Sequence, residues 1–559
     1  SSADAEVWSA AADDLNAALI AQESGYTNVG LHVDPQDWQT QPADEIVQSV
    51  IAQVEDRSGD ETRQIILLHD GGGDRRQTIS ALPKIIDELR ARGFQFVSVA
   101  TLARLSRDNT MPPVVSGDMI AVQADTGLFM LLSALGQALN WIFLAAILIG
   151  MARALIMTSL AFLQYDHSRH QARPPIDPSL LVTVIIPAFN EERVIEAAVR
   201  QVLANRDAHI EVFVVDDGST DATAAIVRAA FGDDPRVQLI SLPNGGKAKA
   251  LNHAIGLARG EVLIAHDADT LFGTDTIARL ARWFADPRIG AVAGNVKVAN
   301  RVNLITRWQA IEYVTSQNLE RRALAAVNSI TVVPGAVGAF RRAALVPGYP
   351  EDTMAEDQDL TIRIQRNGWK VIYDPSAMAW TEVPESFGLL ARQRFRWAFG
   401  TLQCLWKHRS ILWTFKPIGL ALIGIPQAWV LQIGFALIAP LIDLLLVFNI
   451  TSALVQWLQH GAGEVRVEVA VLALYWFGFT IIDALCGYAA YAMEPRRERC
   501  PVLLLIAQRL VYRQLMYWAV IRAIMAALRG PSVRWGRPKR RGQFGIRRQR
   551  LFFRRVKSI

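Results

Sequence analysis

Residues 126–163 contain a single charged side chain, Arg153, and are otherwise apolar or neutral. This stretch is longer than the roughly 20 residues that an α-helix needs to cross the hydrocarbon core of a bilayer. The whole chain of 559 residues is 51% hydrophobic, which is too apolar and too long for one ordinary water-soluble domain. We therefore predict a membrane protein with water-exposed domains, and one membrane crossing in this stretch.

Three more apolar stretches follow near the C-terminus, at residues 417–450, 467–493 and 501–528. The net charge is only +5, but residues 529–559 form a tail rich in Arg and Lys. Such a tail favours the cytoplasm or anionic lipid. If residues 180–407 lie on the same side as the tail, the three stretches must supply an even number of crossings.

Two arrangements satisfy this requirement. In one, residues 417–450 bend at Pro426 or Pro440 and cross twice. In the other, the last stretch, which carries Arg509, Arg513 and Arg522, lies in the membrane interface. The basic loop "EPRRER" before it favours the second arrangement. Either way, residues 1–120 are expected outside and residues 180–407 inside.

Polar residues end three apolar runs in the middle of the chain: "LVTVIIPAFNEE", "EVFVVDDGSTD" and "GEVLIAHDADT". Such runs are typical of buried parallel strands. Ligands bind beyond the carboxyl ends of the strands in open parallel sheets. The pattern predicts an α/β domain whose polar strand ends converge on one site.

The chemistry of that site follows from its charges. Asp267 and Asp269 offer hard oxygen ligands of the kind that suit Mg²⁺ or Mn²⁺, which usually bind phosphate oxygens as well. Lys247 follows two glycines, where an ammonium group could neutralise phosphate charge. Taken singly, an Asp pair after a strand is more often a turn or a helix cap. Taken together, the pieces predict a site for a metal-bound diphosphate.

Six segments, "VIIPAFNEE", "VVDDGSTD", "GGKAKALN", "AHDAD", "AEDQDL" and "QRFRW", resemble in order and spacing those of the processive family 2 glycosyltransferases. That family includes cellulose, hyaluronan, chitin and poly-N-acetylglucosamine synthases. The resemblance covers about residues 180–410 and the membrane segments after them. It implies a cytoplasmic, Rossmann-like GT-A domain at 180–407 between transmembrane helices, with helices at 417–528 that form a polymer channel.

The resemblance also implies roles for individual residues. Asp357, with Glu356 beside it, is the implied general base in an inverting transfer, and Asp359 would orient it; the family's commoner threonine is Ala355 here. Asp269, with Asp267, is the implied ligand of the metal. The implied donor-binding residues are Pro187, Asn190, Glu191, Asp216, Asp217, Lys247, Asp267, Gln393, Arg394 and Arg396.

By the same resemblance, two segments concern the acceptor and a third concerns a gate over the nucleotide. Gly335 and Ala336 belong to a small-residue acceptor loop, and Trp397 would stack on the acceptor sugar. Without the resemblance, the helix of Trp397 reads as a simple interfacial anchor. Trp535 and Gly536 are similar to a gating segment that closes over the nucleotide; the alternative is a polybasic stretch on anionic lipid.

The first 120 residues resemble a part of the polysaccharide deacetylases. The strings "LHVDPQDW" and "ILLHDGGG" place Asp34, Asp37, Trp38 and His69 at positions of the later motifs of that family. The early motifs, which supply the metal ligands, are absent from the sequence. The alternation of strand-like and helix-like segments predicts an α/β arrangement, but no deacetylase activity is expected from this partial segment.

We interpret the chain as a multi-pass enzyme of the inner membrane that polymerises a UDP-sugar and moves the polysaccharide across the bilayer. UDP-N-acetylglucosamine is the expected donor, because a deacetylase-like segment suits an N-acetylated product; UDP-glucose and UDP-glucuronate remain alternatives. A non-processive lipid-linked sugar transferase and a non-enzymatic export protein are the competing hypotheses. No nucleic-acid partner is expected, and the oligomeric state is left open.

Overall fold

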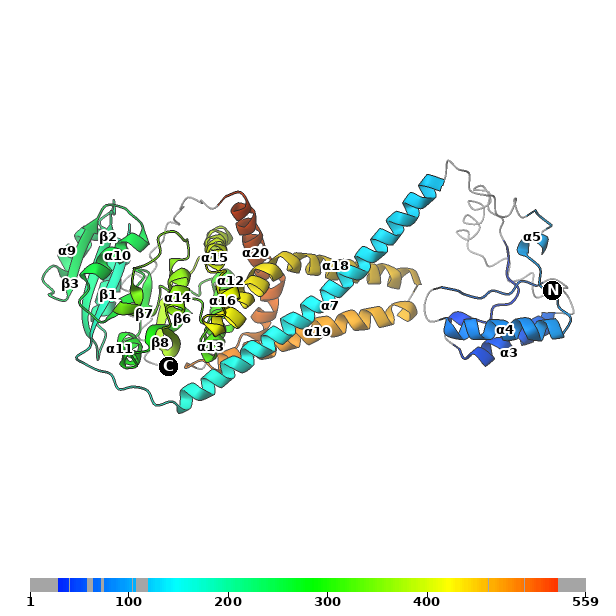
Figure 1. Ribbon diagram of the computed structural model, residues 1–559, viewed down its shortest axis with the longest axis horizontal. Coiled ribbons are helices and arrows are strands. Elements are labelled where there is room, and N and C mark those ends of the chain that lie inside the picture. The colour runs from blue at the N-terminus through cyan, green and yellow to red at the C-terminus, as the bar shows by residue number, and fades with distance from the viewer. Residues whose placement is uncertain are drawn as a thin grey trace. The chain divides into compact units, whose positions relative to one another are not determined.

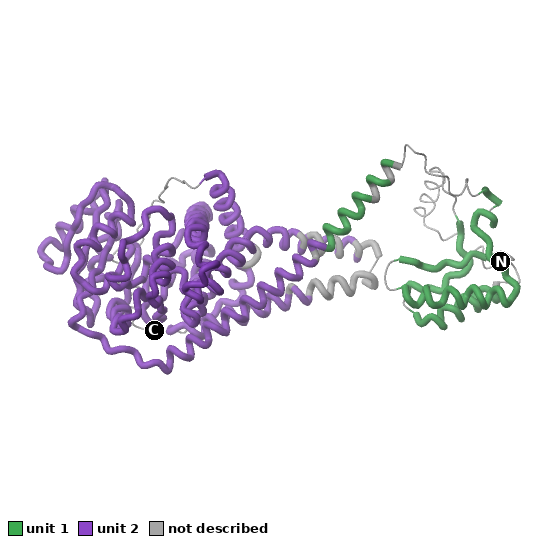
Figure 2. Tube along the Cα trace, viewed as in Figure 1, with its two compact units in different colours: residues 1–137 green, residues 138–559 purple. Residues whose placement is uncertain are grey.

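The computed structural model describes residues 29–39, 41–57, 64–71, 75–102, 104–106, 119–460, 462–496 and 498–530. It divides into two compact units, residues 1–137 and 138–559 (Figure 2). The boundary falls within one long helix, α7 (Met119–His170). The predicted gating residues Trp535 and Gly536 lie outside the described residues.

Unit 1 is built on two packed helices, α3 (Ala43–Arg57) and α4 (Arg76–Ala91), with the short helices η2 (Asp37–Gln39) and α5 (Val99–Leu102). Within its described part, the strand-like sequences form only one parallel bridge, between Val33 and Ile66. Two of the predicted strand-like runs are therefore paired at a single point, and in the described residues of unit 1 neither they nor the third run extend into a strand. A strand needs a paired neighbour for its backbone groups, and no described strand pairs with the segment of Phe96, whose side chain is half exposed.

Unit 2 contains an eight-stranded mixed sheet with the order β3-β2-β1-β4-β7-β6-β8-β5. The strands are β1 (Leu181–Ala188), β2 (His209–Asp217), β3 (Val237–Leu242), β4 (Val262–Ala265), β5 (Thr270–Phe272), β6 (Ile289–Val298), β7 (Gly338–Arg341) and β8 (Lys370–Thr381). The four strands β3, β2, β1 and β4 are parallel. Their carboxyl ends meet at one edge, as the three apolar runs predict.

Helices cover both faces of this sheet (Figure 1). They are α8 (Ile195–Leu203), α9 (Thr223–Phe231), α10 (Lys247–Leu257), α11 (Thr276–Ala281), α12 (Leu304–Glu312), α13 (Leu319–Ala326) and α14 (Glu356–Arg366), with the short helices η3 (Arg282–Ala285), η4 (Tyr313–Asn318) and η5 (Arg342–Leu345). A hydrophobic core lies on each face of the sheet, and alternate side chains of β1 belong to different cores. Val184 packs with α8, α9 and α11, while Ile185 packs with α10, α13 and α14. The result is a three-layer α/β/α domain.

A second group of helices follows the sheet domain. They are α15 (Phe387–Lys407), α16 (Ile411–Thr414), η6 (Leu420–Gly424), α17 (Ile425–Gln427), η7 (Ala428–Gly434), α18 (Phe435–His460), α19 (Ala462–Ala492) and α20 (Val502–Leu528). In Figure 1, α18 and α19 run side by side away from the sheet. The residues of α7 from 138 onward pack on them: the rings of Phe143 and Tyr475 lie 6.4 Å apart.

The structure decides against one of the two predicted arrangements. From η6 through α18 the backbone stays helical without reversing, so residues 417–450 do not bend back at Pro426 or Pro440. The π-helical turns η6 and η7 flank Pro426 and accommodate the backbone group that a proline leaves without a partner. α20 packs along α15 instead of along the full length of α18 and α19.

Two helical segments of the described chain are long and apolar enough to span a membrane, Gly127–His170 and Leu420–Leu444. A shorter apolar helix covers Phe477–Ala492. Length and composition alone are weak evidence for a membrane span, because the core helix of a soluble protein meets the same criteria. The number of crossings therefore stays a prediction.

Candidate functional site

Two loops at the carboxyl edge of the sheet are tied together by Asn190. Its backbone has a positive φ of 57°, a conformation that asparagine tolerates better than most residues. The backbone N–H of Asn190 donates to Ser219 Oγ at 2.9 Å, and its side-chain Oδ1 accepts from the Thr220 N–H at 2.8 Å. The loop after β1, which also holds Glu191, is thereby fixed against the loop after β2, while Pro187 lies near the end of β1 itself.

The two aspartates at the end of β2 have different environments. Asp217 accepts hydrogen bonds from the backbone N–H groups of Gly245 at 2.7 Å and Gly246 at 3.0 Å, and it lines a large cavity. Gly246 has a φ of 93°, which favours glycine. Asp216 is buried and accepts from the Ser219 N–H at 3.1 Å, but it does not line the cavity. Asp217 thus shapes the glycine loop that leads into Lys247.

Lys247, the first residue of α10, links two acidic segments. Its Nζ lies 2.8 Å from Asp267 Oδ1 and 3.3 Å from Glu356 Oε1. Burial opposes the charge of this ammonium group, but Asp267, Glu356 and Asp357 raise the pKa of Lys247 well above its usual range. Lys247 is therefore a fixed positive charge between the end of β4 and the start of α14.

Asp267 and Asp269 both face the cavity from the loop after β4. The residue before them, His266, is fully buried against Phe272, with ring centroids 4.3 Å apart. Burial lowers the pKa of His266 to about 4, so the ring is neutral near pH 7. The two aspartates provide hard oxygen donors, although the described residues form no cluster of three or more side chains that could bind a metal by itself. A metal here would need ligand oxygens as well.

Asp357 and Glu356 begin α14 and also line the cavity. Burial, and then the neighbouring charge of Glu356, raise the pKa of Asp357 to about 6, against the opposing effect of Lys247. Asp359 faces the other way. It accepts from His408 Nε2 and Lys407 Nζ, both at 2.8 Å, and these contacts lower its pKa although burial opposes them. Only the first two acids of the motif belong to the site.

The helix α15 contributes Gln393, Arg394, Arg396 and Trp397 to the cavity wall. Arg394 is buried; its guanidinium donates to Glu312 Oε2 at 2.5 Å and to the Tyr512 hydroxyl at 3.2 Å, and it lies 4.1 Å from the centre of the Trp397 ring. Trp397 is 40% exposed, so its ring is available for stacking. The structure thus gives Arg394 partners in the protein, and its predicted contact with a nucleotide stays a prediction.

Gly335, in the loop before β7, lies close to the end of the Lys247 side chain. A Cβ atom there would lie 2.9 Å from Lys247 Nζ, which is closer than such atoms normally approach. Gly335 and the next residue, Ala336, both line the cavity. The predicted small-residue loop therefore faces Lys247, with room for a ligand where a larger residue would intrude.

One cavity of about 1560 Å³ joins nearly all the predicted site residues. Of the described residues predicted for the transfer site, only Asp216 and Asp359 are absent from its wall. The cavity also continues among α7, α18, α19 and α20. The sequence analysis missed the polar side chains of that part as site residues: Arg153, Glu320, Gln432, Asp443, Asp483, Arg513 and Gln514. The sequence did carry one signal for these residues, because charged side chains are rare within such apolar stretches.

Several known proteins are similar to this chain. The family described as "Glycosyltransferase like family 2" matches residues 178–400. An N-acetylglucosaminyltransferase of Rhizobium meliloti is 32% identical, covering 54% of this chain and 75% of that protein. A poly-beta-1,6-N-acetyl-D-glucosamine synthase of Staphylococcus aureus is 31% identical, covering 39% of this chain and 54% of that protein.

The chain spans little more than half the length of two of the relatives it matches. Among solved structures, a mannosyltransferase from Pyrobaculum calidifontis in complex with GDP-Man and Mn²⁺ is 26% identical, with a TM-score of 0.44, over 63% of this chain and 98% of that one. The match to the R. meliloti protein covers three quarters of that protein, and the family match at residues 178–400 includes the strand-end motifs. The chain therefore belongs to glycosyltransferase family 2.

Proposed function

We propose that unit 2 transfers a sugar from a UDP-sugar to a hydroxyl of an acceptor saccharide, with inversion at the anomeric carbon. The observation that carries this proposal is the position of Asp357. Its carboxyl lines the same cavity as Lys247, Asp267 and Trp397, and its pKa is raised to about 6. A carboxylate with a pKa near the working pH is well suited to accept a proton from a hydroxyl group.

The donor diphosphate would bind at the carboxyl edge of the sheet. Asp267 and Asp269 fit Mg²⁺ or Mn²⁺, since there are more carboxylates than lysines here and a divalent cation would offset part of the negative charge of the carboxylates and of the diphosphate. Such an ion supplies electrostatic stabilisation to the departing UDP. In this proposal Asp217 shapes the glycine loop near the nucleoside, and Lys247 contacts the phosphates.

Trp397 and Asp357 have separate roles in the proposed transfer. Trp397 stacks on the acceptor sugar and orients its hydroxyl toward the anomeric carbon. As the acceptor oxygen forms its bond to that carbon, its proton passes to Asp357 and the bond from the carbon to the diphosphate oxygen breaks. The products are UDP, a saccharide longer by one unit, and a protonated Asp357 that later releases its proton to water.

N-acetylglucosamine is the proposed sugar. The rhizobial and staphylococcal relatives bear names that include N-acetylglucosamine. The resemblance of residues 1–120 to polysaccharide deacetylases would suit an N-acetylated product. In unit 1, Asp37 is buried and accepts from His69 Nδ1 at 2.8 Å and from Thr78 Oγ1 at 2.9 Å. We propose no reaction for unit 1.

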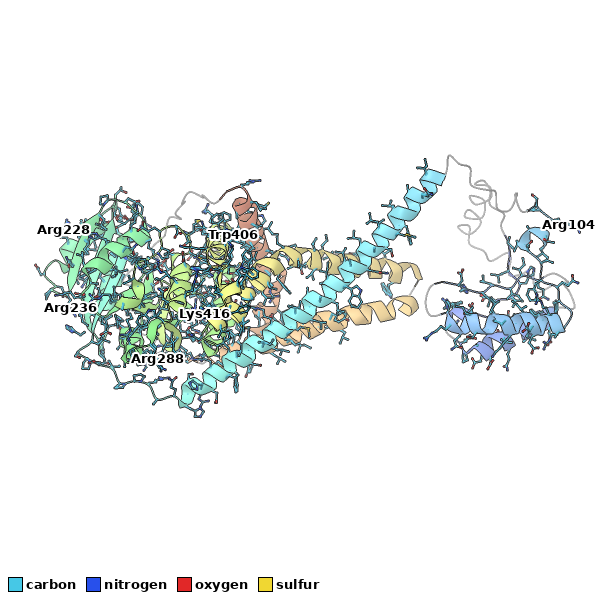
Figure 3. The ribbon with its side chains drawn as sticks, in the orientation of Figure 1. Arg104, Arg228, Arg236, Arg288, Trp406 and Lys416 are labelled. Atoms are coloured by element: carbon cyan, nitrogen blue, oxygen red, sulfur yellow. The ribbon has the colours of Figure 1, made fainter. Side chains whose placement is uncertain are left out.

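The enzyme is proposed to be processive and embedded in the inner membrane. The cavity passes from Asp357 into the region of α7, α18 and α19, which offers a route for a growing chain. Exposed aromatic and basic residues precede η6 in the sequence: Trp406 and Trp413 are 62% and 78% exposed, and Lys416 is exposed as well (Trp406 and Lys416 are labelled in Figure 3). Such residues are typical of the membrane–water interface.

The loop between α19 and α20 supports a specific topology. Glu494 contacts Lys297 of β6 at 2.7 Å, and Glu498 contacts Arg301 at 2.6 Å. This loop therefore lies on the side of the sheet domain. With α18 and α19 as two crossings and α20 in the interface against α15, unit 2 crosses an even number of times after the sheet, and the catalytic domain is cytoplasmic in this proposal.

The test uses the full chain, purified in lipid nanodiscs with Mg²⁺ or Mn²⁺. Radiolabelled UDP-N-acetylglucosamine, UDP-glucose and UDP-glucuronate are supplied separately and in pairs, and both UDP release and product size are measured. We expect a long polymer from UDP-N-acetylglucosamine alone. One sugar on a lipid would favour the non-processive transferase, and failure to release UDP from any donor would contradict an enzymatic role.

A further inference from the structure

Arg394 is buried between three helices, although the sequence predicts that it contacts the donor. Its side chain on α15 is only 2% exposed. Nη2 donates to Glu312 of α12 and to the hydroxyl of Tyr512 on α20, which lies 3.2 Å away. The same hydroxyl donates to the same oxygen of Glu312. One carboxylate is therefore shared by a side chain of α15 and a side chain of α20.

The other two nitrogen atoms of the Arg394 guanidinium have no hydrogen-bond partner among the described residues. Nε and Nη1 are both buried, so a phosphate group could not reach them unless the surrounding side chains moved. Buried N–H groups without acceptors are costly, and an aromatic face can stabilise the charge that they carry. Trp397 provides such a face, because its ring centre lies 4.1 Å from Arg394 Cζ.

This stack supports Trp397 from within the protein. Arg394 and Trp397 are three positions apart on α15, a spacing that places two side chains on the same face of a helix. Trp397 still is 40% exposed and lines the cavity. A ring that is already held in place loses less rotational freedom when a sugar stacks on it. The contact therefore prepares the indole for a ligand.

Tyr512 holds this arrangement from α20. It is 2% exposed, does not line the cavity, and packs against Trp308 of α12 with the ring centres 6.1 Å apart. Within this set of contacts, Tyr512 is linked to Trp397 through Glu312 and Arg394. The junction of α12, α15 and α20 thus acts on the orientation of the indole, although Tyr512 itself touches no ligand.

We propose that Arg394 is a positioning residue for Trp397, that Glu312 and Tyr512 hold its guanidinium group, and that Arg394 makes no contact with the donor. The proposal rests on the proposed function, because it takes Trp397 as the surface on which the acceptor sugar stacks. It deepens that function by adding residues of three helices to the acceptor side of the site. The donor contacts predicted for this segment then belong to Gln393 and Arg396, which also line the cavity.

The test separates the acceptor from the donor. The full chain in nanodiscs receives Mg²⁺ or Mn²⁺ and radiolabelled UDP-N-acetylglucosamine; initial rates of polymer formation give kcat and the donor KM, and calorimetry gives the Kd for UDP. Arg394→Met should lower kcat by about 3- to 10-fold, as the loss of one cation–π contact would, and leave the donor KM and the UDP Kd within about twofold of the parent.

A second variant guards against misfolding. Arg394→Met alone leaves the mostly buried Glu312 without its arginine, and an unpaired buried charge is strongly destabilising. Adding Glu312→Gln removes both charges, and this double variant should show the same loss of kcat while eluting as a single peak at the parent's position. Tyr512→Phe keeps both charges and removes one hydrogen bond, so kcat should fall less, by about 2- to 3-fold.

A comparison with Trp397→Ala tests the link between the two side chains. In a chain that already carries Trp397→Ala, Arg394→Met should cause no further loss of kcat, because the guanidinium then has no ring to hold. Arg409→Met is the matched control. Arg409 also stacks on a tryptophan three positions away, with Cζ 4.5 Å from the ring centre of Trp406, but both residues are exposed and neither lines the cavity. This variant should keep the parent's kcat.

Two results would overturn the proposal. UDP binding weakened by about tenfold or more in the double variant would assign Arg394 to the donor site. An unchanged kcat, or a full additional loss in the presence of Trp397→Ala, would show that Arg394 does not position the indole. Failure of the proposed function has a different signature: the parent enzyme then releases no UDP from any donor, and the positioning role falls with it.

Discussion

The two ends of the cavity in unit 2 carry charge in different ways. At the transfer end, Asp267, Asp269, Glu356 and Asp357 accompany a single lysine, Lys247. The other end, lined by α7, α13, α18, α19 and α20, is called the helix end. There the carboxylates of Glu320, Asp443 and Asp483 accompany Arg153 and Arg513, and each arginine contacts an acid. An excess of carboxylates favours binding of a divalent cation, whereas nearly balanced charges do not. The first arrangement suits a metal ion, and in the second each arginine is already paired within the protein.

The largest effect is expected from removal of a carboxylate at the transfer end. Asp269→Ala takes away one proposed metal ligand without touching the core, so turnover should fall to background in Mg²⁺ or Mn²⁺. Calorimetry should also show that UDP binding no longer depends on the metal. Normal metal-dependent binding and turnover in this variant would remove Asp269 from the metal site.

The next largest effect separates binding from transfer at the same end. Asp357→Asn keeps the shape of the side chain and removes its ability to accept a proton, so transfer should fall by roughly 10²-fold or more. UDP-sugar binding should persist. Asp359→Asn is the better control, because its main effect should be on the stability of the contact between α14 and α15. Gln358→Glu would not be a suitable control, because it adds a negative charge beside Asp357. A variant with weak UDP binding and normal transfer per bound donor would assign Asp357 to the donor site.

Replacement of Trp397 tests the acceptor site, because this residue lies in the cavity wall with the predicted acceptor loop. Trp397→Ala removes a stacking surface worth about 1 kcal/mol beyond area burial, so polymer formation should fall by about 5- to 10-fold or more while UDP still binds. Trp406→Ala is a suitable control, since that ring is exposed and does not line the cavity. Normal chain length and rate in Trp397→Ala would place the acceptor elsewhere.

The smallest effect is a shift in pH dependence. Asp357 must be ionised to accept a proton, so with a pKa of about 6 the transfer rate should rise with pH through that value and level off above it. Glu356→Gln removes the negative charge that helps to raise this pKa, so the midpoint should move to lower pH. The pH profile of initial UDP release checks this. A midpoint that stays fixed or moves up would show that another group controls the rate.

The motifs predicted the transfer end well, because each lies directly after a strand or at the start of a helix. β1, β2 and β4 place their polar ends at one edge by the geometry of parallel pairing alone. Asp216 and Asp359 show where such prediction stops. Side chains two positions apart in a helix point about 200° apart, so Asp357 and Asp359 cannot share a site, and the partners of Asp359 lie 48 and 49 residues away.

The helix end could not be predicted in the same way. Its contacts join residues separated by up to 167 positions, such as Arg153 and Glu320, and no local pattern encodes that pairing. In unit 1, strand-like composition alone did not produce strands, because a strand also needs a neighbour to pair with. The single arginine in residues 126–163 was nevertheless a signal, since a charge is retained in such a stretch only where it has a use.

The buried contact between β6 and the loop after α19 has a consequence for how the protein is made. Asn295 and Lys297 lie in the sheet, yet Glu494, which both side chains contact, follows Asn295 by 199 residues. At about 5–20 residues per second, a ribosome needs roughly 10–40 s to synthesise that interval. Until then Lys297 lacks the carboxylate that compensates its burial. The final packing of the sheet domain therefore waits until the segment that follows α19 has been synthesised.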